Sequence, residues 1–346
     1  STGLTLNALL LTGLALAALY AIAIGANDMA NIIGVLVGGK VTSYKIAVAV
    51  FTSSVIAGAL LQGHMVIKTL GRGIVKTLDI HGAVAASLAA ILWIIIASRL
   101  GLPVSTSQSA VSSVIGVGLA YILKKWEWSL VDFSVINKIL ISWLASPALA
   151  MLLAAIIYTS LNRLLEKKAP KEGLIKALAV TLAGWDGYSF GANDVANATG
   201  VYLAVMEVAG YSRGIGASVL LALLGAVFIA LGGVIMGRRV AETVGFKITR
   251  LDPVGSISSS LVSASSTWLF TTIPYMVMGY GIPVSTTYIT VGTVMGIGVA
   301  KYRSIKRGLN VKLVLTILSA WVLTLPIAAL LGMCFYYALV ILFGGA

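Results

Sequence analysis

Residues 4–24 (LTLNALLLTGLALAALYAIAI) form a long run that contains no charged side chain. A helix of about 20 residues spans the roughly 30 Å hydrocarbon core of a bilayer, so this run predicts a transmembrane helix. Similar segments recur along the chain, which is 59% hydrophobic and only 10% charged, with a mean hydropathy of +1.02. This composition excludes an ordinary soluble domain and predicts an all-α polytopic membrane protein.

The net charge of +13 does not indicate nucleic-acid binding, because the basic residues are scattered between apolar segments. They are typical of anchors at the membrane surface. A single cysteine, Cys334, excludes a disulfide framework, and two histidines, His64 and His81, are too few for a catalytic metal site. We therefore expect no cofactor and no enzymatic activity.

Ten apolar segments divide into five on each side of a basic stretch, NRLLEKKAPKEG (162–173). The segments lie near 4–24, 46–62, 82–99, 104–123, 139–160, 174–190, 214–236, 257–279, 284–300 and 313–343. We predict a first transmembrane repeat at 1–161, a short cytoplasmic linker at 162–173 and a second repeat at 174–346.

Two pairs of motifs indicate that the halves are duplicates. GANDMANIIG (25–34) and GANDVANATG (191–200) share seven of ten positions at an offset of 166. GLPVSTS (101–107) and GIPVSTT (281–287) correspond at an offset of 180. Chance similarity among small apolar residues does not explain polar and proline landmarks that recur in the same order.

An odd number of spans in each repeat predicts that the second repeat is inverted. When loops are assigned alternately to the two sides, 17 Lys and Arg fall on one side and 7 on the other. The richer side is expected to be cytoplasmic, which places both termini outside the cell. Inverted repeats that meet at a central site are typical of alternating-access transporters.

The two Asn-Asp motifs place polar groups inside apolar segments. Within a bilayer, such groups are tolerated only where they are buried in protein or line a cavity. Glycine, asparagine and aspartate disfavour helix interiors, so we expect each motif to break its helix and to be followed by a new one. A polar loop at the membrane surface is the alternative, but ionisable residues within membrane segments are functional sites by default.

The two PVST motifs predict helix N-termini inside the protein, with possible re-entrant hairpins. Proline favours the first helical turn, and serine and threonine cap free amide groups. Such an end, at 103–108 or 283–287, offers N–H groups and a positive dipole end that suit phosphate. The alternative is an ordinary capped transmembrane helix at the headgroups.

The carboxylates Asp28 and Asp194 need a task other than attracting an anion. Hard oxygen ligands favour hard cations, so both side chains are candidates to hold Na⁺. A carboxylate can also accept a hydrogen bond from the P–OH of protonated phosphate, which sulfate lacks at neutral pH. A cation beside an anion lowers the electrostatic cost of binding each, which gives a physical basis for symport.

At these motifs the sequence resembles the inorganic phosphate transporter (PiT) family of sodium- or proton-coupled phosphate symporters. The resemblance covers essentially the whole chain and implies transport of phosphate across the plasma membrane, Na⁺ or H⁺ coupling, and a homodimer. It implies phosphate-binding roles for Asn27, Asp28, Asn31, Ser105, Thr106, Ser107, Gln108, Asn193, Asp194, Asn197, Ser285, Thr286 and Thr287. For Na⁺, the expected ligands are Asp28, Asn27, Asp194, Asn193, Ser105 and Ser285.

Several positions depart from the family pattern. Val55, Ser87 and Thr267 stand where eukaryotic members have glutamates, and Gln108 and Tyr288 follow the PVST motifs in place of histidine. With no histidine or glutamate in the motifs, Na⁺ coupling is favoured over H⁺ coupling. The alternatives are a proton-coupled or sulfate-selective relative, an anion channel, and an intramembrane enzyme, for which no nucleophile–base pair is visible.

Two further charged residues lie close to the motifs or to the ends of apolar segments. Asp186 precedes the second Asn-Asp motif, and we interpret it as a helix-end charge in preference to a partner of the site. Arg72 is interpreted as an interfacial anchor in preference to a phosphate ligand.

Overall fold

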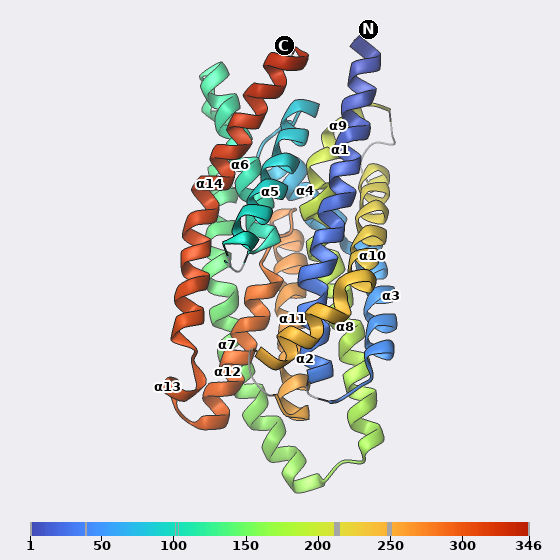
Figure 1. The fold of residues 1–346 in the computed structure, drawn as a ribbon, viewed down its shortest axis with the longest axis vertical. Helices are drawn as coiled ribbons and strands as arrows, with labels where there is room; N and C mark the ends of the chain where they lie inside the picture. The colour runs from blue at the N-terminus through green and yellow to red at the C-terminus, as the bar shows by residue number, and fades with distance from the viewer. Residues whose placement is uncertain are drawn as a thin grey trace.

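The computed structural model describes residues 2–38, 40–100, 102, 104–210, 215–247 and 251–344. These residues are almost all helical and form an elongated bundle whose two termini lie at the same end (Figure 1). Apart from one isolated bridge between Val75 and Val131, the described chain shows no extended pairing. The predicted all-α membrane architecture is confirmed.

The first half contains five long helical units and short connecting turns. Their bounds are α1 Thr2–Ile24, the π-helical η1 Gly25–Met29, α2 Ala30–Gly38, α3 Tyr44–Gln62, α4 His64–Lys68, the π-helical η2 Thr69–Gly73, α5 Ile80–Arg99, α6 Thr106–Lys125, the 3₁₀ turn η3 Trp128–Leu130, and α7 Phe133–Lys168.

The second half repeats this order. Its elements are α8 Glu172–Thr199, the 3₁₀ turn η4 Gly200–Tyr202, α9 Leu203–Val208, α10 Ile215–Lys247, α11 Pro253–Met278, α12 Thr286–Tyr302, α13 Ile305–Gly308 and α14 Val311–Phe343.

Seven helical stretches of the described chain are long and apolar enough to cross a membrane. They are Gly3–Val37, Tyr44–Gln62, Ile80–Arg99, Thr106–Lys125, Phe133–Lys168, Gly216–Ile235 and Val311–Phe343. The other predicted segments fall on α8, α11 and α12, which carry more polar side chains, and most of those side chains are buried. Polar groups of these three helices therefore face the protein interior.

The predicted helix break at the second Asn-Asp motif is wrong. Residues 191–199 continue α8, and the helix tightens into a 3₁₀ turn only at 200–202. At the first motif, residues 25–29 form a π-helical turn that joins α1 to α2. Asparagine and aspartate favour turns when they bond to their own backbone. Here the buried side chains of the second motif bond to other helices, so the helix persists.

Two hairpins carry the PVST motifs into the interior. The α5–α6 hairpin occupies the half of the bundle near the termini, and the α11–α12 hairpin occupies the other half (Figure 1). Both hairpins start in the same way, because the Asp79 carboxylate accepts from Gly82 N at 2.7 Å and the Asp252 carboxylate accepts from Gly255 N at 2.6 Å. The possible re-entrant hairpins thus have a structural counterpart.

Corresponding helices run in opposite directions. In Figure 1, α1 descends from the N-terminus, whereas α8 rises from the turn that follows α7. Each of these helices packs against the second long helix of the other half, α1 against α10 and α8 against α3. Opposite directions and exchanged partners are what an inverted duplication predicts.

The close contacts between the halves come in matched pairs. A Cβ on Gly58 of α3 would lie 1.9 Å from Tyr188 O, and one on Gly232 of α10 would lie 2.1 Å from Ile22 O. Gly58 and Gly232 are 174 residues apart, and Ile22 and Tyr188 are 166 apart, the offset of the Asn-Asp motifs. The two helix pairs therefore use equivalent glycines to bring their backbones together.

The same packing between halves joins α6 and α12, the helices that begin at the PVST motifs, to the last helix of the opposite half. A Cβ on Gly116 of α6 would lie 1.8 Å from Ala329 O in α14, and one on Gly296 of α12 would lie 2.0 Å from Met151 O in α7. Gly116 and Gly296 differ by 180, as the PVST motifs do. These contacts support the predicted inverted repeats.

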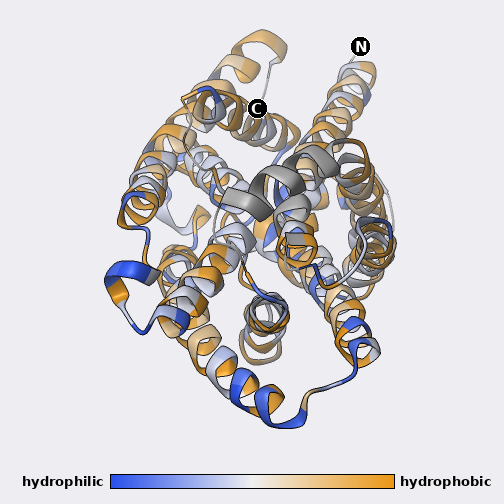
Figure 2. Cartoon of the chain, turned by 60° about the horizontal axis from the view of Figure 1, so that its bottom comes forward, coloured by the Kyte–Doolittle hydropathy of each residue, from blue (hydrophilic) through white to orange (hydrophobic). Residues whose placement is uncertain are grey.

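Hydrophilic residues gather at the end of the bundle opposite the termini. Figure 2 shows them on the turn between α7 and α8 and around α13, with apolar residues along the helix flanks. Only residues 169–171 of the predicted linker 162–173 lie between helices, because α7 extends to Lys168. Arg99, which the alternating assignment of loops counts among the 17 basic residues of the richer side, is the last residue of α5 and does not lie in a loop.

We predict that Gly58→Ala destabilises the protein, whereas Gly184→Ala does not. Both glycines lie at the α3–α8 contact, but a Cβ at position 184 would come no closer to a neighbour than 3.4 Å, at Ser54 Oγ. Overpacking costs about 1–3 kcal/mol, while replacing a helical glycine by alanine otherwise gains up to about 1 kcal/mol. The thermal unfolding midpoint in detergent should fall for Gly58→Ala and stay or rise for Gly184→Ala; equal midpoints would contradict the close packing.

Candidate functional site

The tips of the two hairpins are helix N-termini buried inside the protein. Ser105 caps α6, its hydroxyl accepting from Gln108 N at 3.2 Å, and Ser285 caps α12, its hydroxyl accepting from Tyr288 N at 3.3 Å. Both cap residues are buried. The prediction that helices begin at these motifs inside the protein is confirmed.

The proline of the second PVST motif lies slightly outside the predicted position. Pro283 stands two residues before the cap Ser285, so it belongs to the approach to the helix and not to its first turn. Its carbonyl accepts from Trp143 Nε1 at 3.1 Å, a contact with α7 of the other half. Pro103 lies outside the described residues.

Both aspartates of the Asn-Asp motifs are buried against these tips. Asp28 accepts from Thr106 Oγ1 at 2.5 Å and from Thr287 Oγ1 at 3.1 Å. Asp194 accepts from Thr286 Oγ1 at 3.0 Å. Thr106 and Thr286 are equivalent in the two repeats, so each aspartate meets the first threonine of its own tip. The second donor to Asp28 comes from the opposite repeat.

Asn193 holds the second tip in place. Its Nδ2 donates to Thr271 Oγ1 at 2.8 Å and to Ile282 O at 2.9 Å, and its Oδ1 accepts from Val284 N at 3.2 Å. The sequence predicts Asn193 as a ligand of phosphate and Na⁺, but these bonds engage the amide within the protein. In this structure Asn193 therefore positions residues 282–284.

Asn197 and Ser107 tie the two tips together. Asn197 Nδ2 donates to Ser107 Oγ at 2.8 Å, and Ser107 Oγ donates to Val284 O at 2.7 Å. Asn197 and Val284 belong to the second repeat and Ser107 to the first. We call Asp28, Thr106, Ser107, Asn193, Asp194, Asn197, Thr286 and Thr287 the tip cluster.

Some buried polar atoms at the tip cluster have no hydrogen-bond partner among the described residues. They are Asp194 Oδ1, Asn197 Oδ1, and both Oε1 and Nε2 of the adjacent Gln108. Leaving a buried polar group unsatisfied costs about 1–3 kcal/mol, and more for a charged one. Three of these atoms are acceptors, which can bind a cation, and one is a donor, which can bind an anion.

Two predicted site residues of the first motif are not placed in the tip cluster. Asn27 is exposed, and no hydrogen bond joins it to the cluster within the described chain. Adjacent side chains of a helical turn point in different directions, so the turn that points Asp28 into the tip cluster points Asn27 away from it. The side chain of Asn31 lies outside the described residues.

Sequence reasoning missed Tyr20 and misplaced Asp186. The buried Tyr20 hydroxyl donates to Thr106 O at the first tip. Asp186 lies in the middle of α8 and is buried, so its interpretation as a helix-end charge is wrong. Both residues stand five positions before the glycine of an Asn-Asp motif, a signal that the alignment of the halves already contains.

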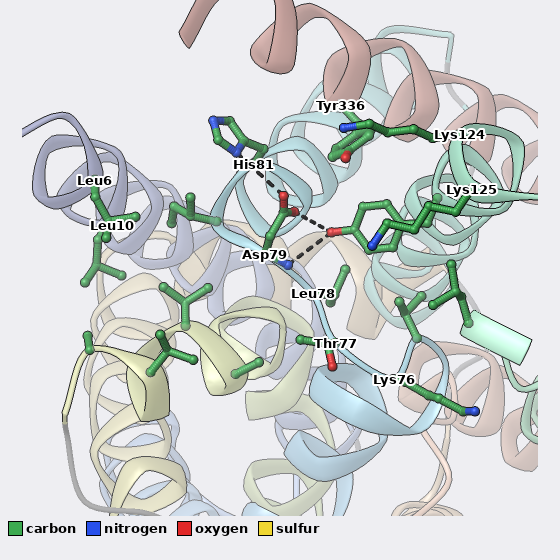
Figure 3. A pocket seen from close by; sticks show the side chains of 18 of the residues that line it. Leu6, Leu10, Lys76, Thr77, Leu78, Asp79, His81, Lys124, Lys125 and Tyr336 are labelled. Atoms are coloured by element: carbon green, nitrogen blue, oxygen red, sulfur yellow. Dashed lines mark hydrogen bonds and ion pairs between the residues drawn. The ribbon is translucent and has the colours of Figure 1, made fainter. Parts of the chain in front are cut away.

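A separate cavity of about 670 Å³ lies at the C-terminal end of α6, the far end from the tip cluster. In Figure 3, Asp79 lies close to His81, and the lining residues Lys124, Lys125 and Lys76 all lie to one side of it, with Lys76 pointing away. The Asp79 carboxylate accepts from the Tyr121 hydroxyl and caps α5. Because α6 is about 30 Å long, this cavity is not the predicted site.

At the same end, Arg72 pairs with Glu207. This ion pair joins η2 of the first half to α9 of the second. Arg72 is thus engaged in an ion pair within the protein, and its interpretation as an interfacial anchor stays a prediction.

The fold and the tip cluster define a class of protein. Apolar helices enclose buried carboxylates, and two helix N-termini meet these carboxylates in the interior. Helix N-termini favour anions, and buried carboxylates need a proton or cation. This is the design of a multi-pass membrane protein that carries small ions through a central site.

Comparison with known proteins agrees. Residues 24–332 match the model of the Phosphate transporter family. The chain belongs to this family.

Relatives and a solved structure match over nearly the whole chain. A candidate phosphate permease of Thermococcus kodakarensis is 28% identical, over 92% of this chain and 95% of its own. The sulfate permease CysP of Bacillus subtilis is 31% identical, over 94% and 85%. The solved structure of a sodium-dependent phosphate transporter superposes with a TM-score of 0.79 and 27% identity, covering 96% of this chain and 99% of that one.

We predict that Thr286→Val impairs phosphate uptake more than Thr287→Val. Asp194 has one threonine donor, whereas Asp28 keeps Thr106 when Thr287 is lost. A hydrogen bond to a charged group contributes about 1.5–3 kcal/mol, or roughly tenfold to a hundredfold in affinity. Uptake of radiolabelled phosphate by proteoliposomes measures this order, with unfolding midpoints as the check on folding. A larger defect in Thr287→Val would contradict the assigned contacts.

Proposed function

We propose that the protein is a secondary active transporter that couples the inward movement of inorganic phosphate to Na⁺. The observation that carries this proposal is the pairing of each buried aspartate with a helix N-terminus in the interior. A carboxylate and a helix N-terminus offer opposite electrostatic environments within one site. Together they accommodate a cation and an anion at once.

The donors suit phosphate. In the first turn of α6 and of α12, the leading N–H groups have no intrahelical acceptor, and each serine cap satisfies only one of them. The remaining amides and Gln108 Nε2, which has no partner among the described residues, can donate to phosphate oxygens. The positive ends of both helix dipoles add to this attraction.

The acceptors suit Na⁺. Asp194 Oδ1, Asn197 Oδ1 and Gln108 Oε1 are buried oxygens without a donor among the described residues, and Asp28 adds a second carboxylate. Hard cations prefer carboxylate and amide oxygens. The matched solved structure is that of a sodium-dependent transporter, which supports the same ion. In this assignment Asp28 and Asp194 hold the coupling ions, and Asn193 supports them by fixing the second tip.

Sulfate is the second candidate substrate, because CysP of Bacillus subtilis is a sulfate permease. The chemistry of the site favours phosphate. At neutral pH, phosphate retains a P–OH group that can donate to a buried carboxylate, whereas sulfate only accepts. Two aspartates beside the anion site therefore discriminate against sulfate. Proton coupling through the same carboxylates is the alternative to Na⁺.

The arrangement of the hairpins supports transport by alternating access. The tips approach the tip cluster from opposite halves of the bundle (Figure 1) and bond to each other through Ser107 Oγ and Val284 O. If one repeat rocks against the other, the contact between Ser107 Oγ and Val284 O would break, and the tip cluster would open to one side of the membrane.

We further propose a location in the plasma membrane with both termini outside. The basic end around the α7–α8 turn would then be cytoplasmic, in line with the positive-inside rule. A homodimer is also proposed. Its support is the family resemblance, and cross-linking in native membranes tests it.

Asp28→Asn and Asp194→Asn should each lower Na⁺-driven phosphate uptake by about tenfold or more, equivalent to at least about 1.4 kcal/mol. Each change removes the negative charge that stabilises the coupling ion but keeps the side-chain shape. Purified protein in liposomes, given labelled phosphate with an inward Na⁺ gradient, a pH gradient or neither, supplies the measurement.

The matched control is Asp132→Asn. Asp132 is an exposed N-cap of α7, and asparagine caps a helix as well as aspartate, so uptake should stay at the wild-type rate. Wild-type uptake that ignores Na⁺ and follows the pH gradient would remove Na⁺ from the proposal. Competition by excess sulfate equal to that by unlabelled phosphate would overturn the substrate assignment.

A further inference from the structure

The cavity at the end of the bundle near the termini has no part in the proposed transport site. Its volume of about 670 Å³ falls within the range of roughly 300–1,000 Å³ that is typical of small-molecule sites. Its walls come from the start of α1, residues 75–81 at the start of α5, the end of α6, α9 and α14. A ligand bound here would be separate from the ions that the tip cluster holds.

Most of the cavity wall is apolar. Leu10 and Leu78 of the first half and Val205 of the second half line it. Leu6 and Val208 also line it and are exposed, so the apolar surface continues to the mouth of the cavity. An inorganic anion gains nothing from such a wall, whereas an acyl chain is stabilised when it leaves water.

One side of the cavity is positively charged. Lys124 and Lys125 belong to the last turn of α6, and Figure 3 shows both on the same side of Asp79. Lys76 is a further basic residue of the lining, and Asp79 is its one acidic residue among those described. The Asp79 carboxylate is already engaged, because it accepts from the Tyr121 hydroxyl and caps α5. The lining as a whole therefore attracts an anion.

His81 adds a polar atom without a partner to the cavity. Its Nε2 is buried and has no hydrogen-bond partner among the described residues, while its Nδ1 lies 3.6 Å from Asp79 Oδ2. Buried polar atoms normally bond to protein or to ordered water. His81 Nε2 is therefore available to a polar group of a ligand.

The cavity lies where membrane-spanning segments begin and end. Of the apolar helices, Gly3–Val37 and Ile80–Arg99 begin beside it, and Thr106–Lys125 ends there. Trp126 and Trp128 follow the two lysines of α6 and are exposed. Exposed tryptophans at the ends of spanning helices are typical of the membrane–water interface, and lysines there extend to the headgroups. The mouth of the cavity is thus at the level of the lipid headgroups.

We propose that this cavity binds an anionic phospholipid, with its phosphate beside Lys124 and Lys125 and part of an acyl chain along the apolar wall. One such ligand would match the charge of the lysines, the apolar wall and the free His81 Nε2 together. A free phosphate ion would match only the charge. The inference goes beyond the proposed function and does not depend on which ion is coupled.

A lipid in this cavity would contact both repeats. α1, α5 and α6 belong to the first repeat, and α9 and α14 belong to the second. A ligand that binds the folded arrangement stabilises it against unfolding. Because alternating access moves the repeats relative to each other, the bound lipid should also favour the arrangement of repeats that forms the cavity.

The test is a titration of the purified protein in detergent with dioleoylphosphatidylglycerol or dioleoylphosphatidylcholine, followed by native mass spectrometry. We expect saturable binding of phosphatidylglycerol, about tenfold tighter than that of phosphatidylcholine, and a rise in the unfolding midpoint. The two lipids share their chains and differ in headgroup charge, so equal affinities would overturn the proposal. Glycerol phosphate carries the headgroup without chains. If it displaced the lipid at equal concentration, the site would bind a free phosphate ester, and the lipid assignment would be wrong.

The first variant combines Lys124→Gln with Lys125→Gln, and its matched control combines Lys167→Gln with Lys168→Gln. Both pairs are exposed lysines in the last turn of a long helix, and each helix is followed by a residue with positive φ. The pair that lines the cavity should lose about tenfold in affinity for phosphatidylglycerol, and the control pair should lose none. An equal loss in both would overturn the site, because it would show a general attraction of lysines to anionic lipid.

The second variant, Val208→Trp, fills the mouth of the cavity and leaves its charge unchanged. Its matched control is Val277→Trp, because Val208 is 84% exposed and lines the cavity, whereas Val277 is 78% exposed and lies on α11 outside the lining. Val208→Trp should weaken phosphatidylglycerol binding by about tenfold, and Val277→Trp should not. Unchanged binding in Val208→Trp would contradict a chain inside the cavity, even if the lysine variant does not fold. These measurements need neither Na⁺ nor uptake, so their failure would leave the proposed function standing.

Discussion

The structure depends on helix N-termini that end inside a membrane protein instead of at its surface. Free amide groups are costly in an apolar interior, so each tip must be satisfied by polar partners. Ser105 and Ser285 provide the caps, and the aspartates of the Asn-Asp motifs accept from the adjacent threonines. The serine caps and the aspartates lower the cost of burying the tips, and they leave other amides and oxygens available to bind ions.

Close backbone packing fixes where these tips meet. Equivalent glycines bring α3 against α8 and α10 against α1, and each repeat uses the other as its packing partner. Gly25 and Gly191, the first residues of the two motifs, follow the same rule, because a Cβ on either would collide with a carbonyl of the opposite repeat. Glycine in these motifs thus serves packing and not a helix break.

The scaffold is more symmetric than the chemistry that it carries. Asp28 accepts from both tips, whereas Asp194 accepts from one and keeps an oxygen with no partner among the described residues. Tyr20 donates to a carbonyl at the first tip, whereas the equivalent position of the second repeat is Asp186, whose Oδ2 has no partner among the described residues. Equivalent backbones in the two repeats therefore carry different polar side chains.

The sequence alone determined the membrane class, the duplicated halves, the buried helix starts at the PVST motifs and all eight residues of the tip cluster. Apolar length, matched offsets and capping residues are local signals, and they survive folding because every helix must satisfy its own backbone. Tertiary structure decided the rest. It kept α8 helical through its Asn-Asp motif, engaged Asn193 with its own tip, turned Asn27 outward and buried Asp186. Those outcomes depend on which neighbour each side chain meets, and spacing along one chain does not specify that neighbour.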